Sequence, residues 1–193
     1  MGRPRDGAID VAILRAAREL LADHGYGGVT IDRIARRAGV GRPTVYRRWS
    51  TKADLMFDAI FEEVETIEIP ERGDAVTGLL EMAKVFSRAL ASPAAAQALV
   101  AVMADVGSDS DIAANVRGRI RSRTTDVAAL VERAQSEGLV RSDLDPVAFV
   151  HAVAGALYYR AAVLGEHVTE DLVVGIFDLF TRGLQPPDTT IST

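Results

Sequence analysis

Apolar residues recur along most of the chain at intervals of three and four, the spacing of one face of an α-helix. The first run ends before Gly25 and predicts a helix over residues 9–24. Its members are Ile9, Ile13, Ala16, Leu20 and Leu21. No run of strict apolar and polar alternation, and no Asn-Gly hairpin signal, lies between β-branched segments. The pattern therefore predicts an all-α fold.

Two short helices are predicted next. Thr30 is a typical N-cap, and Gly39 supplies the left-handed residue that commonly follows a helix end. A third helix begins near Arg42 and runs to about Arg48. Pro43 lies in its first turn, where the missing N–H leaves no hydrogen bond unmade. These spacings predict two short helices joined by a tight turn.

Longer helices are predicted in the remaining sequence. Ser50 or Thr51 caps a fourth helix, whose apolar face extends from Leu55 to Ile67. The predicted helices after it cover residues 74–91, 94–105, 111–137, 146–164 and 169–183. The two ends, residues 1–8 and 185–193, lack an apolar pattern. We expect a flexible basic arm at the first and a flexible tail at the second.

The charge of the chain is unevenly distributed. The 193 residues carry a net charge of −5, but residues 1–52 contain 11 Lys or Arg and 5 Asp or Glu, a net of +6. Residues 53–193 contain 11 and 22, a net of −11. A basic module suits phosphate, and an acidic one has no electrostatic reason to approach it. We therefore predict a DNA-binding domain over 1–52 and a second domain over 53–193.

Composition excludes several function classes. The chain has no cysteine, which rules out disulfides, thiolate metal sites and cysteine nucleophiles and suits the cytoplasm. No apolar run after the basic start is long enough for a signal peptide. The most membrane-like stretch, 147–165, contains His151 and Arg160, so we interpret it as a buried helix. We predict no metal site and no cofactor.

Residues 30–52 carry the strongest functional signal. In a helix-turn-helix, two short helices cross closely around a tight turn. Ala35 is small enough for that approach, Gly39 makes the turn four residues later, and Val45 follows where an apolar residue would wedge between the helices. Ala, Gly and Val are common residues, so this triple gains its specificity from its neighbours.

The same segment resembles the TetR family of DNA-binding regulators. The family pattern of Thr, Ile-Ala, Ala-Gly-Val, Thr-hydrophobe-Tyr, an aromatic residue and Lys is present in order and spacing. The matching residues are Thr30, Ile34, Ala35, Ala38, Gly39, Val40, Thr44, Val45, Tyr46, Trp49 and Lys52. Gly41 replaces a common Ser cap and Trp49 a commoner Phe, and neither change alters the expected fold. We expect Trp49 to pack in the core.

Recognition helices read base edges from their first turn. The forked Arg42 side chain suits guanine, and Pro43 or Thr44 suits a thymine methyl. Arg47 and Arg48 lie one turn later. Residues suited to phosphate contact are Thr30, Tyr46 and Lys52. Two alternatives stay open. Arg33, Arg36 and Arg37 either contact phosphate or form a solvated face of their helix. Arg3 and Arg5 either enter a minor groove or are only solvated.

The resemblance also implies a small-molecule pocket and a homodimer formed by two long C-terminal helices, here 146–164 and 169–183, with Ile176 and Phe177 against the partner. Met and aromatic residues suit an apolar ligand. The candidate lining residues are Met56, Ile60, Phe61, Met82, Phe86, Leu99, Met103, His151 and Tyr158. For each of them the alternative is ordinary core packing. The resemblance implies a repressor that leaves a palindromic operator when a ligand binds.

Two other functions compete with this interpretation. One is an α-helical hydrolase using Asp109 and Asp111, or Asp143 and Asp145, although both pairs lie beside turns and fit helix caps better. The other is an architectural DNA-binding protein without an effector. Four arginines at positions 117, 119, 121 and 123 resemble an anion site. Steps of two residues divide them between opposite faces of a helix, so they cannot form a single patch.

Overall fold

The computed structural model describes residues 7–66, 74–108 and 110–182, and within these ranges all regular structure is helical. The α-helices are α1 (Gly7–Gly28), α2 (Ile31–Arg37), α3 (Arg42–Tyr46), α4 (Lys52–Thr66), α5 (Ala75–Ala89), α6 (Pro93–Ser108), α7 (Ser110–Ser136), α8 (Pro146–Tyr158) and α9 (Glu170–Arg182). A short π-helix, η1 (Tyr159–Val163), continues α8. The all-α prediction is confirmed. The expected basic arm, including Arg3 and Arg5, and the expected tail lie largely outside the described residues.

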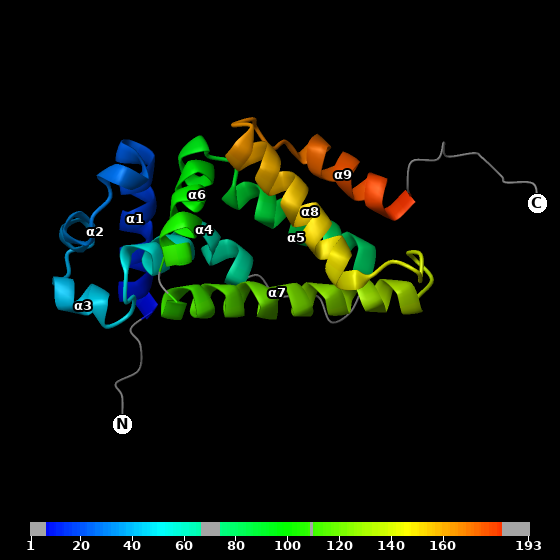
Figure 1. Cartoon of the computed structure of the whole chain (residues 1–193), viewed down its shortest axis with the longest axis horizontal. Coiled ribbons are helices and arrows are strands. Elements are labelled where there is room, and N and C mark those ends of the chain that lie inside the picture. The colour runs from blue at the N-terminus through cyan, green and yellow to red at the C-terminus, as the bar shows by residue number, and fades with distance from the viewer. Residues whose placement is uncertain (1–6, 67–73, 109, 183–193) are drawn as a thin grey trace, which may run out of the picture.

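Helices α1, α2 and α3 form one end of the molecule (Figure 1). The Thr30 hydroxyl accepts from the Arg33 N–H at 3.2 Å, which caps α2, and Gly39 has the positive φ of 69° expected after its end. Pro43 lies in the first turn of α3 behind the N-cap Gly41. The first helix is longer than predicted. A kink at Gly25 (φ 63°) is followed by one more turn that ends at Gly28.

The core of this end contains the residues that the helix-turn-helix pattern requires. Ile34 and Val45 are fully buried, and Ala35 and Trp49 retain 3% and 5% of their exposure. Small and apolar side chains at these points allow α2 and α3 to approach each other and α1. The expected core position of Trp49 is confirmed.

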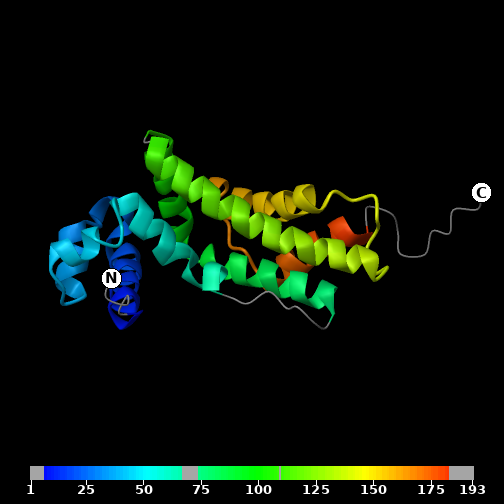
Figure 2. The same cartoon turned by 90° about the horizontal axis from the view of Figure 1, so that it is seen from below.

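Helix α4 contacts α1 at this end and leads into the larger helical body, where it contacts α5, α6 and α7. The long α7 runs along the body, with α8 and α5 packed against it and α9 against α5 and α8 (Figures 1 and 2). The core is continuous from α1 through α4 to α9. One helix therefore belongs to the packing of both ends.

The apolar helix α8 with its extension η1 is buried along one stripe. The buried residues are Phe149, Val153, Leu157 and Ala161, spaced by four. Val147, Val163 and Leu164 are exposed, so the prediction of a buried helix is correct for that stripe and wrong for the other faces. By length and composition alone, the helix over residues 146–163 is long and apolar enough to cross a membrane.

Candidate DNA interface and ligand cavity

The first turn of α3 faces solvent at the outer end of the molecule. Arg42 and Pro43 are exposed, Thr44 is partly exposed, and the Tyr46 ring retains 52% of its exposure. Arg47 is exposed and donates to the Thr44 hydroxyl at 3.3 Å. The structure thus brings five of the residues predicted to meet DNA onto one short, exposed helix and its end.

Arg42 forms an ion pair with Asp32, in the first turn of α2. This carboxylate lies beside the side chain that we expect to read a base. A carboxylate in such a position orients a guanidinium and also competes with a base edge for its N–H donors. Asp32 was not among the residues predicted from the sequence.

Arg48 points toward the protein. Its guanidinium pairs with Asp10 of α1 and donates to the Thr44 carbonyl at 3.1 Å, and the side chain is only 12% exposed. These contacts fix the end of α3 to α1. Arg48 therefore has a structural role in this arrangement, which the basic pattern of the sequence did not indicate.

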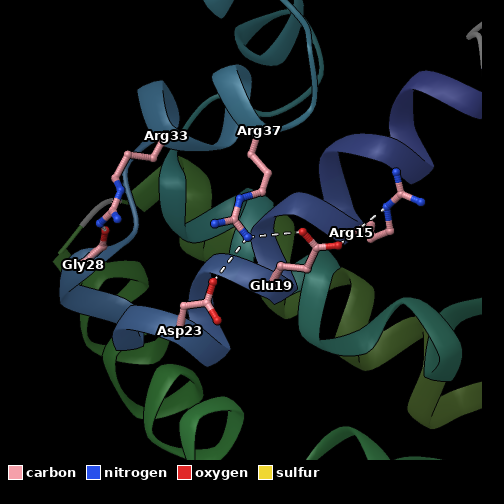
Figure 3. Close-up of polar contacts among 6 residues, drawn as sticks. All are labelled: Arg15, Glu19, Asp23, Gly28, Arg33 and Arg37. Atoms are coloured by element: carbon pink, nitrogen blue, oxygen red, sulfur yellow. Dashed lines mark hydrogen bonds and ion pairs between the residues drawn. The ribbon is translucent and has the colours of Figure 1, made fainter.

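The second helix holds two of its arginines against neighbouring segments (Figure 3). Arg33 donates to the Gly28 carbonyl at 2.6 Å, and Arg37 lies 3.3 Å from both Glu19 and Asp23 of α1. Arg36 is exposed. The sequence left open whether these arginines are solvated or contact phosphate. In the structure Arg33 and Arg37 instead connect α2 to α1.

Lys52 begins α4 at the junction with α1. Its ammonium lies 3.7 Å from the centroid of the Tyr26 ring and donates to the Tyr26 carbonyl at 3.2 Å. Burial lowers the pKa of Lys52 against the opposing effect of the Asp105 carboxylate. A cation above an aromatic face is held in place without a full ion pair. The arrangement keeps a positive charge at the start of α4.

A cavity of about 460 Å³ opens inside the helical body, within the size range of small-molecule sites. Its wall is contributed by α4, α5, α6, α7, α8 and α9. Aromatic side chains line much of it: Phe61 stacks on Phe86 with ring centroids 5.8 Å apart, and Phe149 meets Phe177 edge-on at 5.7 Å. Such a wall is suited to an apolar ligand.

The structure brings together six of the nine candidate ligand residues. Those that line the cavity are Phe61, Met82, Phe86, Leu99, Met103 and Tyr158. Met56 and Ile60 are instead buried in the core outside its wall, so for them core packing describes the position. His151 is exposed on α8, away from the wall. A buried α4 face and an exposed α8 face look alike in sequence when both lie in apolar runs.

The two charged residues of the cavity were missed, along with most of its apolar lining. Arg119 and Arg123 both line the wall, one helical turn apart on α7. The division of the arginines between two faces was correctly expected, and Arg117 and Arg121 are exposed. The available signal was that spacing of four, which places one arginine pair on a single face.

The carboxylates considered for hydrolysis have other roles where the structure describes them. Asp145 accepts from the Ala148 N–H at 2.8 Å and caps α8, as expected, and Asp143 binds Arg141 at 2.5 and 2.6 Å. Asp109 and the side chain of Asp111 lie outside the described residues. Among the described residues, no group of three or more His, Asp or Glu side chains is arranged to hold a metal ion.

Both ends of the chain match families of known proteins. Residues 13–59 match "Bacterial regulatory proteins, tetR family", and residues 69–180 match "Tetracyclin repressor-like, C-terminal domain". The chain belongs to the TetR family. A relative, the HTH-type transcriptional regulator YdeS of Bacillus subtilis, is 30% identical over 99% of this chain and 97% of its own length. The chain is thus a DNA-binding transcriptional regulator with a helix-turn-helix.

Solved structures of several regulators share the fold. The TetR-family regulator SCO0332 superposes with a TM-score of 0.67 at 27% identity, covering 92% of this chain and 99% of its own. FadR from Bacillus subtilis, solved with stearoyl-CoA, gives 0.66 at 18% identity over 91% and 99%. AibR, solved with isovaleryl coenzyme A and operator DNA, gives 0.57 at 16% over 89% and 97%. The similarity to the last two establishes the fold alone.

Proposed function

We propose that this TetR-family protein is a cytoplasmic, ligand-responsive repressor that binds a palindromic operator as a homodimer and is released when a small molecule fills the cavity. Residues 1–52 act as the DNA-binding domain and residues 53–193 as the effector and dimerisation domain. The observation that carries the proposal is that α4 contributes Lys52 beside the helix-turn-helix and Phe57, Phe61 and Val64 to the cavity wall. One helix thus touches both sites.

The DNA-binding role of named residues follows from their positions. Arg42, Pro43 and Thr44 read bases from the exposed first turn of α3, and Tyr46 with Arg47 extends that surface. Thr30 and Lys52 contact phosphate, and Arg33 and Arg48 add phosphate contacts when bound DNA displaces them from Gly28 and Asp10. Phosphate contacts of this number give affinity that falls steeply with salt.

Dimerisation is supported by the apolar residues that α8, η1 and α9 leave exposed. They are Val147, Tyr159, Val163, Leu164, Val174 and Leu179. Because α8 and α9 pack against each other, exposed apolar residues on both helices suit a two-fold partner that uses the same face. Phe177 lies outside this surface because it is 5% exposed and packs on Phe149, so the expectation that it faces the partner is wrong.

Ligand-bound neighbours with the same fold support an effector role for the cavity. FadR was solved with an acyl-CoA, and AibR with an acyl-CoA together with operator DNA. A ligand that prefers a conformation with α4 displaced must weaken operator binding by linkage, because two recognition helices read a palindrome only at one separation.

The test is a two-stage measurement. Binding sites are first selected from fragments of the source genome with the purified protein. Fluorescence anisotropy of the selected site is then followed while small molecules that raise the thermal midpoint are added. We expect these ligands to lower operator affinity by about 1–3 kcal/mol. A protein that binds the selected DNA tightly but responds to no stabilising ligand would act as an architectural factor.

A further inference from the structure

The cavity wall is largely apolar and carries one positively charged strip. Among the described residues that line it, the charged side chains are Arg119 and Arg123, and none is acidic. Both lie on the same face of α7, one turn apart. Arg123 donates from Nη2 to the Met82 sulfur at 3.5 Å, a weak acceptor. Cationic groups on an apolar wall favour an anion inside it.

Arg119 connects the cavity to α4. Its guanidinium pairs with Asp58, approaches Asp54 at 3.7 Å, and lies 4.9 Å from the centroid of the Phe57 ring, which also lines the cavity. The Arg119 side chain thus contacts the cavity wall on one side and two carboxylates of α4 on the other. Helix α4 also packs against the helix-turn-helix end.

Asp58 carries the connection into the helix-turn-helix. Its Oδ2 accepts from the Trp49 indole N–H at 2.7 Å, and Trp49 is packed in the core behind α3. The row of contacts is therefore the cavity, Arg119, Asp58 and Trp49. Trp49 is the single tryptophan of the chain, so its fluorescence reports on the last contact of the row.

Arg119 pairs both with Asp58 of this row and with the neighbouring Asp54. Asp54 and Asp58 lie one turn apart on α4, and the pKa of Asp54 is raised by burial and by the charge of Asp58, while Arg119 opposes both effects. Drawing Arg119 away leaves like charges on one face of α4. Such repulsion favours a different position of the helix.

We propose that the ligand of this cavity is an amphipathic carboxylate, whose apolar part lies among the aromatic side chains and whose carboxylate binds Arg123 and takes Arg119 from Asp58. This inference rests on the proposed function and specifies its ligand and its first step. Guanidinium groups bind carboxylates through paired N–H donors. A neutral ligand leaves Arg119 on Asp58, and a cationic one is repelled by the strip.

The first experiment compares three probes of equal chain length, dodecanoate, dodecanol and dodecylammonium, by calorimetry on the full chain. Concentrations stay below the micelle concentrations of the two ions and below the solubility limit of dodecanol. We expect dodecanoate to bind at least about ten-fold more tightly than dodecanol. Arg123→Gln removes most of that difference and Arg123→Lys retains part of it. Arg121→Gln, on the exposed face of α7, leaves the difference unchanged. Equal affinities for the acid and the alcohol overturn the proposal, as does the absence of dodecanoate binding.

The second experiment follows Trp49 emission at saturating ligand. We expect dodecanoate to shift the emission in the direction that Arg119→Gln shifts it without ligand, because both leave Asp58 without its cationic partner, and to produce little further shift in that variant. Emission that is unchanged by bound dodecanoate overturns the competition for Arg119. Dodecanoyl-CoA as a fourth probe separates a free carboxylate from a thioester: tighter binding of the thioester overturns the carboxylate assignment.

The outcomes also separate this inference from the proposed function. If dodecanol binds as tightly as dodecanoate and releases operator DNA, the protein is a ligand-responsive repressor with a neutral effector. If dodecanoate binds through Arg123 but leaves operator affinity unchanged, the ligand class is correct and the regulatory function is wrong.

Discussion

The hydroxyl of Tyr26, in the last turn of α1, donates to a carboxylate oxygen of Asp105 on α6 at 2.5 Å. The ammonium of Lys52 lies over the ring of the same tyrosine. Burial, together with the hydrogen bond to Asp105, raises the pKa of Tyr26 well above its usual range, so the hydroxyl keeps its proton through neutral and mildly alkaline pH. One side chain thus joins α1, α4 and α6 at the boundary between the two ends of the molecule.

Tyr26→Phe removes this bond and keeps the ring beneath Lys52. We expect the free energy of unfolding to fall by about 1 kcal/mol, because the Asp105 carboxylate loses a donor that lies partly out of solvent. Urea denaturation monitored by circular dichroism measures the change. Tyr46→Phe, on a ring that is half exposed, is the matched control and should leave stability unaltered. Equal stabilities of the Tyr26 variant and the wild type would show that the bond contributes nothing.

Arg42 is the residue that we expect to read a base. Arg42→Ala should reduce affinity for the selected operator by about 1–3 kcal/mol and relax preference at one base position in each half-site. Anisotropy titrations with single-base operator variants and with random DNA measure both effects. An equal loss on operator and on random DNA would assign Arg42 to phosphate.

Asp32 provides the complementary change. Asp32→Asn removes a negative charge from the DNA-facing end and releases Arg42 from its ion pair. We expect affinity for random DNA to increase several-fold at low salt while discrimination between operator and random DNA decreases. Asp143→Asn, whose carboxylate pairs with Arg141 after α7, is the control and should change neither quantity. Tighter binding to the operator alone would mean that Asp32 only restrains Arg42.

Lys52→Gln tests the phosphate contact at the start of α4. Binding to operator and to random DNA should weaken alike, and the slope of log affinity against log salt should decrease by about 2, one for each Lys52 of the proposed dimer. Lys84→Gln on α5, where the lysine pairs with Glu81, is the control and should leave both slopes unchanged. A loss restricted to the operator would show that Lys52 positions the recognition helix instead.

The lowered pKa of Lys52 adds a stability test with a definite sign. A lysine whose pKa is lower in the folded state binds its proton more weakly there, so its charge opposes folding at neutral pH, and this effect disappears as pH rises through the two pKa values. The stability of the wild type relative to Lys52→Gln should therefore increase from neutral to alkaline pH. Parallel urea titrations at several pH values measure it, and a constant difference would contradict the sign.

Much of the fold was predictable because its signals are local. Thr30, Gly39, Pro43 and Asp145 each act on the neighbouring turn of backbone, so they mark helix ends without knowledge of the tertiary structure. The extra turn of α1 was not predicted, since Gly25 has the signal of a helix end and only the structure shows that helical bonding resumes after it.

The candidate site was predictable only where a side chain had one possible direction. The first turn of α3 has to point outward, because Val45 fixes the inward face. The direction of the Arg48 side chain depends on Asp10, 38 residues away. The direction of the Arg119 side chain on α7 depends on Asp58, which lies on α4. Ion pairs between distant residues leave no periodic pattern, so a basic cluster in the sequence cannot separate DNA contacts from structural pairs.

The dimer prediction follows from the exposed apolar residues of α9. Val174 is 39% exposed and points away from the core that Val173 and Phe177 fill. If a two-fold partner covers this face, Val174→Glu buries a carboxylate without a partner, and the protein should elute as a folded monomer in size-exclusion chromatography with light scattering. Val100→Glu, on a similarly exposed valine of α6, is the control and should remain dimeric. Phe177→Glu should instead unfold the chain, because that ring belongs to the core. A Val174→Glu protein that stays dimeric would place the interface on another face.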